Sequence, residues 1–251
     1  MSVLAAARRI ASVAGHVFHG LWVANLRLPG APEAERQAAV QWWSRKLLAL
    51  MGIELRLDGA LVPEAVLAVA NHVSWLDIAS LHAASPRIRF VSKAAVAHWP
   101  LIGRLTRTAH TLYIERERKR DALRVVHEVA AALKQGDAVG VFPEGTTGPG
   151  DTVLPFHANL LQAAISTGTP VQPIVLRYSE PGWPVSEAAQ YLDDTTLVGS
   201  LLRMARARGI VVHVSFLEPV APASQGRREL AQVLRERVVG RLAADLARAG
   251  D

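Results

Sequence analysis

The stretch that decides the fold is Val66-Leu67-Ala68-Val69-Ala70, followed directly by Asn71-His72-Val73-Ser74-Trp75-Leu76-Asp77. The five apolar residues fit one short buried strand, and a segment with helical spacing follows the polar residues. Apolar strands and helix-like segments then alternate along the chain. Continuous apolar strands that alternate with helices indicate a mostly parallel sheet with helices on both faces.

The other predicted elements extend this pattern in both directions. Strands are expected over residues 53–57, 66–70, 88–91, 111–114, 138–142, 171–176 and 211–216. Helices are expected over 76–84, 94–106, 121–135, 160–167, 190–207 and 227–248. There is no internal repeat, so we expect one α/β domain over residues 52–251.

Residues 1–51 are expected to form a helical hairpin ahead of this domain. Pro29-Gly30-Ala31-Pro32 would end one helix and begin another, because proline cannot continue a helix and glycine tolerates the turn. Polar residues interrupt the first helix before it reaches the roughly 20 apolar residues that a membrane span needs. We expect a hairpin that lies on a membrane or inserts shallowly. Ordinary packing on the domain is the alternative.

Composition limits the possible partners and chemistry. The 251 residues include 28 basic and 22 acidic side chains, which gives a formal net charge of +6. This surplus suits an anionic partner, such as an acidic lipid surface, a phosphorylated substrate, an acidic carrier protein or nucleic acid. The chain has no cysteine, which excludes disulfides, thiolate metal sites and cysteine nucleophiles. It also lacks a G-x-S-x-G elbow, a P-loop and a complete zinc-protease motif.

His72 and Asp77 form the first candidate site. Five residues in a continuous helix turn the chain by about 500°, so these side chains can meet only if His72 lies on a loop and Asp77 in the first helical turn. A carboxylate fixes the tautomer of a histidine and stabilises the imidazolium, which makes the pair a minimal general base. The structural alternative is a capping box between Ser74 and Asp77.

A second polar stretch, Phe142-Pro143-Glu144-Gly145-Thr146-Thr147, follows another predicted strand. It offers a carboxylate, a glycine that permits close approach, two hydroxyls and backbone N–H groups that could cradle an anion. The carboxyl ends of parallel strands meet at one edge of a sheet, so we expect both stretches at that edge.

The residues also carry a family resemblance, in four ordered blocks. The chain resembles the glycerolipid acyltransferases of the 1-acylglycerol-3-phosphate acyltransferase (PlsC-like) type. The first block is the NHxxxxD motif and the third is FPEGT, and both are specific; the second and fourth are weak alone. The matching residues are Asn71-His72 with Asp77, Tyr113-Ile114-Glu115-Arg116, Phe142-Pro143-Glu144-Gly145-Thr146 and Val171-Gln172-Pro173-Ile174-Val175.

The resemblance implies a membrane-associated O-acyltransferase at the cytoplasmic face of the cell membrane. The donor would be acyl-CoA or acyl-acyl carrier protein, and the acceptor a lysophospholipid, foremost 1-acylglycerol-3-phosphate, which would become phosphatidate. Neither a metal or other cofactor nor a nucleic-acid partner is implied. His72 would be the general base and Asp77 would orient it. Substrate binding would involve Arg116, Glu144, Gly145 and Thr146, together with Lys93.

Two regions depart from the family. Many phosphatidate-forming members carry arginine where this chain has Thr147, which removes one potential phosphate clamp. Some members with threonine act on other lysolipids, including lyso-ornithine lipid, so such a lysolipid is the alternative acceptor. The second block departs too, since His110 and Thr111 occupy positions where a glycine is frequent. A further alternative, from a different class, is a non-catalytic protein that binds anionic membrane through its hairpin and basic surface.

Overall fold

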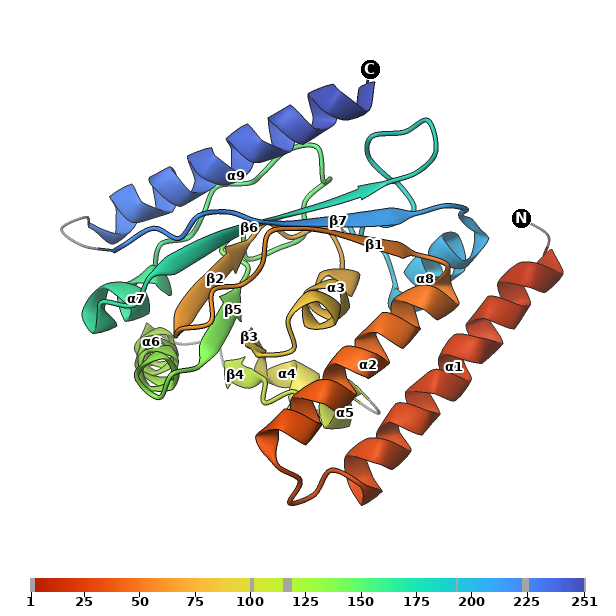
Figure 1. Ribbon diagram of the computed structural model, residues 1–251, viewed down its shortest axis with the longest axis horizontal. Helices are drawn as coiled ribbons and strands as arrows, with labels where there is room; N and C mark the ends of the chain where they lie inside the picture. Colours follow the sequence, from red (N-terminus) through yellow and green to blue (C-terminus); the bar gives the residue numbers. More distant parts are fainter. Residues whose placement is uncertain (1–2, 100–101, 115–118, 193, 223–225, 251) are drawn as a thin grey trace.

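The computed structural model describes residues 3–99, 102–114, 119–192, 194–222 and 226–250. Within them, seven strands form one sheet in the order β1-β7-β6-β2-β5-β3-β4 (Figure 1). All neighbouring strands are parallel except β6 and β7. The predicted α/β fold with a mostly parallel sheet is therefore confirmed.

The strands lie close to their predicted positions. They are β1 (Glu54–Asp58), β2 (Val66–Ala70), β3 (Ile88–Lys93), β4 (Leu112–Ile114), β5 (Ala138–Val141), β6 (Val171–Ser179) and β7 (Val211–Phe216). The helices are α1 (Val3–Leu26), α2 (Glu33–Met51), α3 (Leu76–Ala84), α4 (Ala94–Ala97), α5 (Ile102–Thr108), α6 (Lys119–Lys134), α7 (Leu161–Thr167), α8 (Leu197–Arg206) and α9 (Arg227–Gly250).

Helices cover both faces of the sheet, and each face has its own core (Figure 1). Helices α2, α3 and α8 pack on one face, and α6, α7 and α9 on the other. In β2, Ala68 and Ala70 belong to the first core, whereas Leu67 and Val69 belong to the second. This two-sided burial explains why β2 is a continuous apolar run and not an alternating one.

The N-terminal helices α1 and α2 lie side by side as an antiparallel hairpin (Figure 1). Leu47, Leu48 and Met51 of α2 belong to the same core as the sheet, so the hairpin is packed on the α/β part. Its outer side nevertheless exposes large apolar residues, among them Phe18 and Trp22. No helix within the described residues is long and apolar enough to cross a membrane.

Three predicted elements need correction. The single helix expected over 94–106 is two short helices, α4 and α5, and the sequence places Pro100 between them, where a helix cannot continue. The helix expected from residue 190 begins at Leu197, because the Thr196 side chain accepts a hydrogen bond from the Gly199 N–H and caps it there. Strand β6 continues to Ser179 through its antiparallel pairing with β7.

Candidate active site

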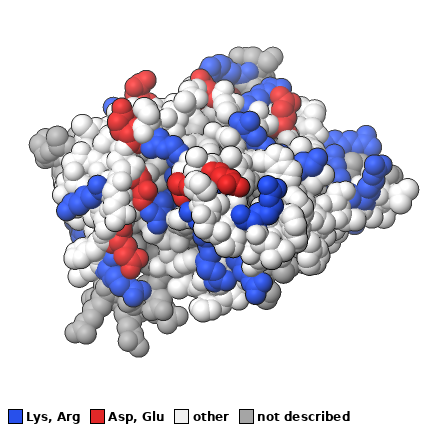
Figure 2. Space-filling model, turned by 60° about the horizontal axis from the view of Figure 1, so that its bottom comes forward, with Lys and Arg blue, Asp and Glu red and all other residues white. Residues whose placement is uncertain are grey.

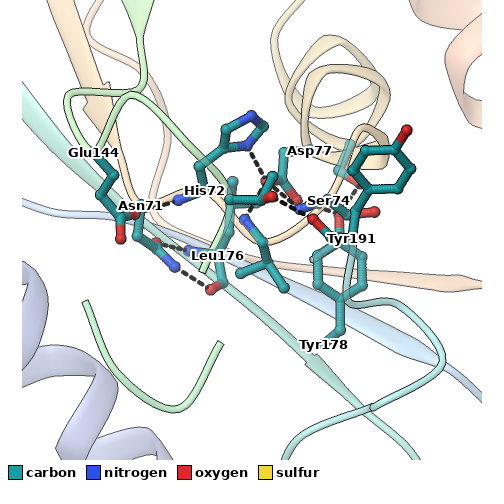
Figure 3. A network of polar contacts seen from close by, with 11 residues as sticks. Asn71, His72, Ser74, Asp77, Glu144, Leu176, Tyr178 and Tyr191 are labelled. Atoms are coloured by element: carbon teal, nitrogen blue, oxygen red, sulfur yellow. Dashed lines mark hydrogen bonds and ion pairs between the residues drawn. The ribbon is translucent and has the colours of Figure 1, made fainter. Parts of the chain in front are cut away.

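The central contact joins His72 and Asp77 (Figure 3). His72 lies on the loop that follows β2, and Asp77 lies in the first turn of α3. The His72 Nδ1 atom is 2.7 Å from Asp77 Oδ2. The geometric condition set by their spacing is therefore met, and the pair sits at the carboxyl end of a central parallel strand.

The Asp77 carboxylate is fully buried, and both of its oxygens accept hydrogen bonds. Oδ2 also accepts from the backbone N–H groups of Val73 at 2.7 Å and Ser74 at 2.9 Å. Oδ1 accepts from the Tyr178 hydroxyl at 2.8 Å. Four donors thus converge on one side chain and fix its position.

The capping box predicted as the structural alternative is half formed. Asp77 reaches back to the N–H of Ser74, as such a box requires. The Ser74 hydroxyl, however, is buried and has no hydrogen-bond partner among the described residues. Asp77 therefore orders the start of α3 and contacts the histidine at the same time, so the two interpretations of this aspartate are compatible.

The contacts of His72 determine which of its ring nitrogens is free. An ionised carboxylate can only accept, so Nδ1 must carry the proton and Nε2 holds the lone pair. No described residue makes a hydrogen bond to Nε2. The ring stacks on Phe142, with a centroid distance of 4.0 Å, and 20% of the side chain is exposed. The Nε2 lone pair is therefore available to accept a proton.

Asn71 anchors the loop to the neighbouring strand β6. Its side-chain N–H donates to the carbonyl of Leu176 at 2.9 Å, and its side-chain oxygen accepts from the Leu176 N–H at 2.8 Å (Figure 3). The backbone pairing of β2 with β6 ends at Ala70, and beyond it the Asn71 side-chain amide makes these two hydrogen bonds to β6 instead. His72 thus follows a buried and doubly hydrogen-bonded residue.

Glu144 joins the two polar stretches through backbone contacts. Its Oε1 accepts from the His72 N–H at 2.6 Å, and its Oε2 accepts from the Leu154 N–H at 2.7 Å. The side chain is 5% exposed, and this burial raises the pKa of the Glu144 carboxyl. In this conformation Glu144 holds the loop of His72 in place. Its predicted contact with the acceptor stays a prediction.

The other predicted binding residues lie at the same sheet edge or outside the described part. Gly145 and Thr146 are exposed in the turn after β5, and Gly145 has a φ of 73°, which glycine adopts without strain. Lys93 is the last residue of β3, so its backbone lies at this edge; its side chain is not among the described groups. Arg116 lies outside the described residues.

Thr147 has a structural contact where many family members have arginine. Its hydroxyl donates to the backbone carbonyl of Tyr191, and the Tyr191 N–H donates to the Val73 carbonyl at 3.1 Å. Through Tyr191, Thr147 therefore connects the turn after β5 to Val73, which lies on the same loop as His72. Among the described residues, no group of His, Asp and Glu side chains could hold a metal ion.

Sequence reasoning missed Tyr178, the donor to Asp77 Oδ1. The expected strand ended at residue 176, two positions too early. Its signal was a polar-tipped aromatic residue directly after a buried apolar run, which favours a hydroxyl with a buried partner. Tyr178 is fully buried and also lies 3.2 Å from the Ser80 hydroxyl. Its hydroxyl is the side-chain donor that holds Asp77 Oδ1 in place.

Both the matching family model and the similar sequences are those of acyltransferases. Residues 55–177 match the model of a family described as acyltransferase. A lyso-ornithine lipid O-acyltransferase of Pseudomonas aeruginosa is 37% identical, over 94% of this chain and 91% of that protein. A 1-acyl-sn-glycerol-3-phosphate acyltransferase of Neisseria meningitidis is 33% identical, over 75% of this chain and 73% of that protein.

A solved structure shares the fold. The 1-acyl-sn-glycerophosphate (LPA) acyltransferase PlsC from Thermotoga maritima superposes with a TM-score of 0.73 and covers 96% of this chain and 95% of its own. The two sequences are 19% identical, so this match speaks for the fold alone.

Proposed function

Because this chain belongs to the acyltransferase family, we propose that it moves a fatty acyl group from an acyl thioester to the free hydroxyl of a lysolipid. The observation that carries the proposal is the His72–Asp77 pair, with Nδ1 held by the carboxylate and Nε2 free of hydrogen bonds to the described residues. Membership in an enzyme family argues against the non-catalytic membrane-binding alternative.

The reaction needs one proton transfer in each direction. His72 Nε2 removes the proton of the acceptor hydroxyl while the oxygen attacks the thioester carbonyl carbon. The tetrahedral intermediate then collapses, the C–S bond breaks, and the imidazolium returns the proton to the thiolate. Asp77 stabilises the imidazolium between the two steps. A thioester is already activated, so positioning and deprotonation suffice and neither a metal nor another cofactor is needed.

Two acceptors are candidates. One is 1-acylglycerol-3-phosphate, the substrate named by the Neisseria relative. In that case Arg116 and Lys93 would bind its phosphate, since basic side chains pair with phosphate oxygens. The other is lyso-ornithine lipid, named by the Pseudomonas relative that matches over most of the chain. Thr147 favours this second acceptor, because its hydroxyl is turned to Tyr191 and offers no cation for a phosphate.

The lipid acceptor requires access to a membrane. We propose that the protein binds peripherally or inserts shallowly at the cytoplasmic face through the α1–α2 hairpin. Phe18, Trp22 and Trp42 are each at least half exposed on this hairpin, and the chain carries a net charge of +6. Exposed aromatic residues and basic charge are the features that hold an amphipathic element at an anionic bilayer.

The decisive test is acyl transfer by the purified protein from radiolabelled acyl-CoA and acyl-acyl carrier protein onto separate lysolipids. The panel contains 1-acylglycerol-3-phosphate, lyso-ornithine lipid and lysophosphatidylethanolamine, and His72→Ala is the control. Product with any acceptor that disappears in the control supports the proposal and names the acceptor. Product that the control forms equally well would contradict His72 as the base. No product with any pair would contradict the proposed function.

A further inference from the structure

A basic cleft lies where the turn of the hairpin meets α5. It has a volume of about 390 Å³, and its basic lining consists of Arg36, Arg104, Arg107 and His110. Ala24, Leu28 and Pro29 of the hairpin form the rest of its wall, with Asn25 and Thr108. Figure 1 places the hairpin turn and α5 at the same end of the molecule, and Figure 2, which brings that side forward, shows more basic than acidic side chains.

The cleft is separate from the candidate active site. The guanidinium of Arg89, near the start of β3, donates to the backbone carbonyl of His110 at 3.1 Å. Arg89 also pairs with Asp137, which directly precedes β5. His110 therefore lies by the amino ends of the parallel strands, whereas His72 follows the carboxyl end of β2. A molecule in this cleft would not present its hydroxyl to His72.

Arg104 and Arg107 keep donors available to an anion in the cleft. Glu33 is the nearby acidic residue among the described contacts, and it already pairs with Arg36 at 3.3 Å and faces His110 at 3.7 Å. Arg107 uses one nitrogen for the Ala97 carbonyl and leaves others free. Arg104 is exposed, and its guanidinium makes no hydrogen bond or ion pair with the described residues. Guanidinium groups bind phosphate oxygens with paired donors.

His110, which lines the cleft, has an unusual backbone conformation. His110 has a φ of 52°, in the left-handed region that glycine adopts most easily. Here a histidine takes the strained conformation, and its imidazole lies at the cleft and faces Glu33. Strained residues of this kind gather at functional sites.

An apolar stripe on α1 leads to the same cleft. Phe18, Trp22 and Leu26 follow one another at intervals of four residues and are 62%, 50% and 69% exposed. Residues at this spacing lie on one face of a helix. Leu28 and Pro29, directly beyond the stripe, line the cleft. An apolar stripe that ends at a group of arginines suits a lipid, with its chains along the helix and its phosphate among the guanidiniums.

We propose that this cleft binds the phosphate of an anionic membrane lipid that is not the acceptor of the reaction. The ligand chemistry is a phosphate mono- or diester, and the adjoining stripe favours a lipid headgroup over free phosphate. Such a site would fix the hairpin to anionic bilayers at a set orientation. The inference builds on the proposed membrane association but requires neither His72 nor acyl transfer.

The test compares two charge reversals of exposed arginines. Arg104→Glu alters the cleft, and Arg206→Glu is the matched control at the other end of α1, where Arg9 contacts the end of α8. Binding is measured by co-sedimentation with phosphatidylcholine vesicles, with and without phosphatidylglycerol. One basic side chain at an anionic surface contributes roughly fivefold in affinity, so the reversal in the cleft should weaken binding to the anionic vesicles roughly 30-fold. The control should change it much less.

Soluble ligands separate the two sources of phosphate. Calorimetric titration with dihexanoyl-phosphatidylglycerol should show binding to the wild type and loss of it in Arg104→Glu, whereas inorganic phosphate should bind much more weakly. Equal effects of the two reversals on vesicle binding would overturn the proposal, as would inorganic phosphate that binds as well as the lipid.

Acyl transfer to an acceptor in detergent keeps this test distinct from that of the proposed function. Arg104→Glu should retain this activity, because the cleft lies away from His72. A wild type without turnover would contradict the proposed function and leave the binding result unaffected.

Discussion

Replacement of Asp77 by asparagine removes a charge while it preserves the shape of the network. The amide oxygen can occupy the place of Oδ2 and still accept from the backbone N–H groups of Val73 and Ser74. The amide N–H₂ then faces Tyr178, whose hydroxyl can accept from it and donate to Ser80 at 3.2 Å. We therefore expect Asp77→Asn to fold, with a loss of about 1 to 2 kcal/mol in the free energy of unfolding as charge-assisted hydrogen bonds become neutral ones.

The effect on the reaction should be larger than the effect on stability. The imidazolium that forms on His72 gains about 4 kcal/mol from a carboxylate 4 Å from its charge at an effective dielectric constant of about 20. The amide dipole replaces part of this stabilisation. The turnover number should then fall roughly a hundredfold to a thousandfold. The Michaelis constants should change little, since Asp77 is fully buried and reaches no substrate.

The assay is steady-state acyl transfer by the wild type and Asp77→Asn, together with urea unfolding of both. The expected result is a folded variant with a strongly reduced turnover number and nearly unchanged Michaelis constants. A folded variant with a turnover number within a few-fold of the wild type would refute the argument that the charge of Asp77 supports the histidine.

Three further predictions concern the surroundings of the pair. Tyr178→Phe removes the hydroxyl that donates to Asp77 Oδ1. It should lower the free energy of unfolding by roughly 1 to 3 kcal/mol in urea unfolding and reduce turnover less than Asp77→Asn does. Asn71→Ala leaves the Leu176 N–H and carbonyl unpaired in a buried place, and the same measurement should show a loss of roughly 2 to 4 kcal/mol. Burial lowers the pKa of His82 in the folded protein to about 4. As the pH falls below about 6.5, His82 therefore takes up a proton in the unfolded chain but not in the folded one, and the folded state loses stability. Between pH 7 and pH 5 the wild type should lose about 2 kcal/mol more than His82→Gln, and equal losses would contradict this assignment.

The sequence predicted most of the fold because its signals are local. Apolar runs of strand length alternate with helical segments, and this pattern requires a mostly parallel sheet whatever the details of packing. The break between α4 and α5 was missed, although Pro100 stands between them in the sequence. The extension of β6 to Ser179 could not be predicted, because it depends on antiparallel pairing with β7, which is distant in sequence.

In the candidate site, too, the features with a local sequence signal were predicted and the long-range contacts were not. The spacing of His72 and Asp77 specified a loop and a helix start, which the structure has. The hydrogen-bond partners of Glu144 and Tyr178 could not be predicted, since these contacts join residues 72 and 101 positions apart in the chain. Long-range hydrogen bonds of buried side chains leave no periodic signal. The family resemblance implied acceptor binding for Glu144, which stays a prediction, and the structure adds backbone contacts on both of its oxygens.

The most direct test of the central claim is the rate of acyl transfer by purified His72→Ala, measured beside the wild type at saturating donor and acceptor. His72 is the general base in this account, so the variant should unfold like the wild type and lose roughly a hundredfold to ten-thousandfold in turnover. A folded variant that retains the wild-type rate would contradict the account, because no proton acceptor at Nε2 would then be needed.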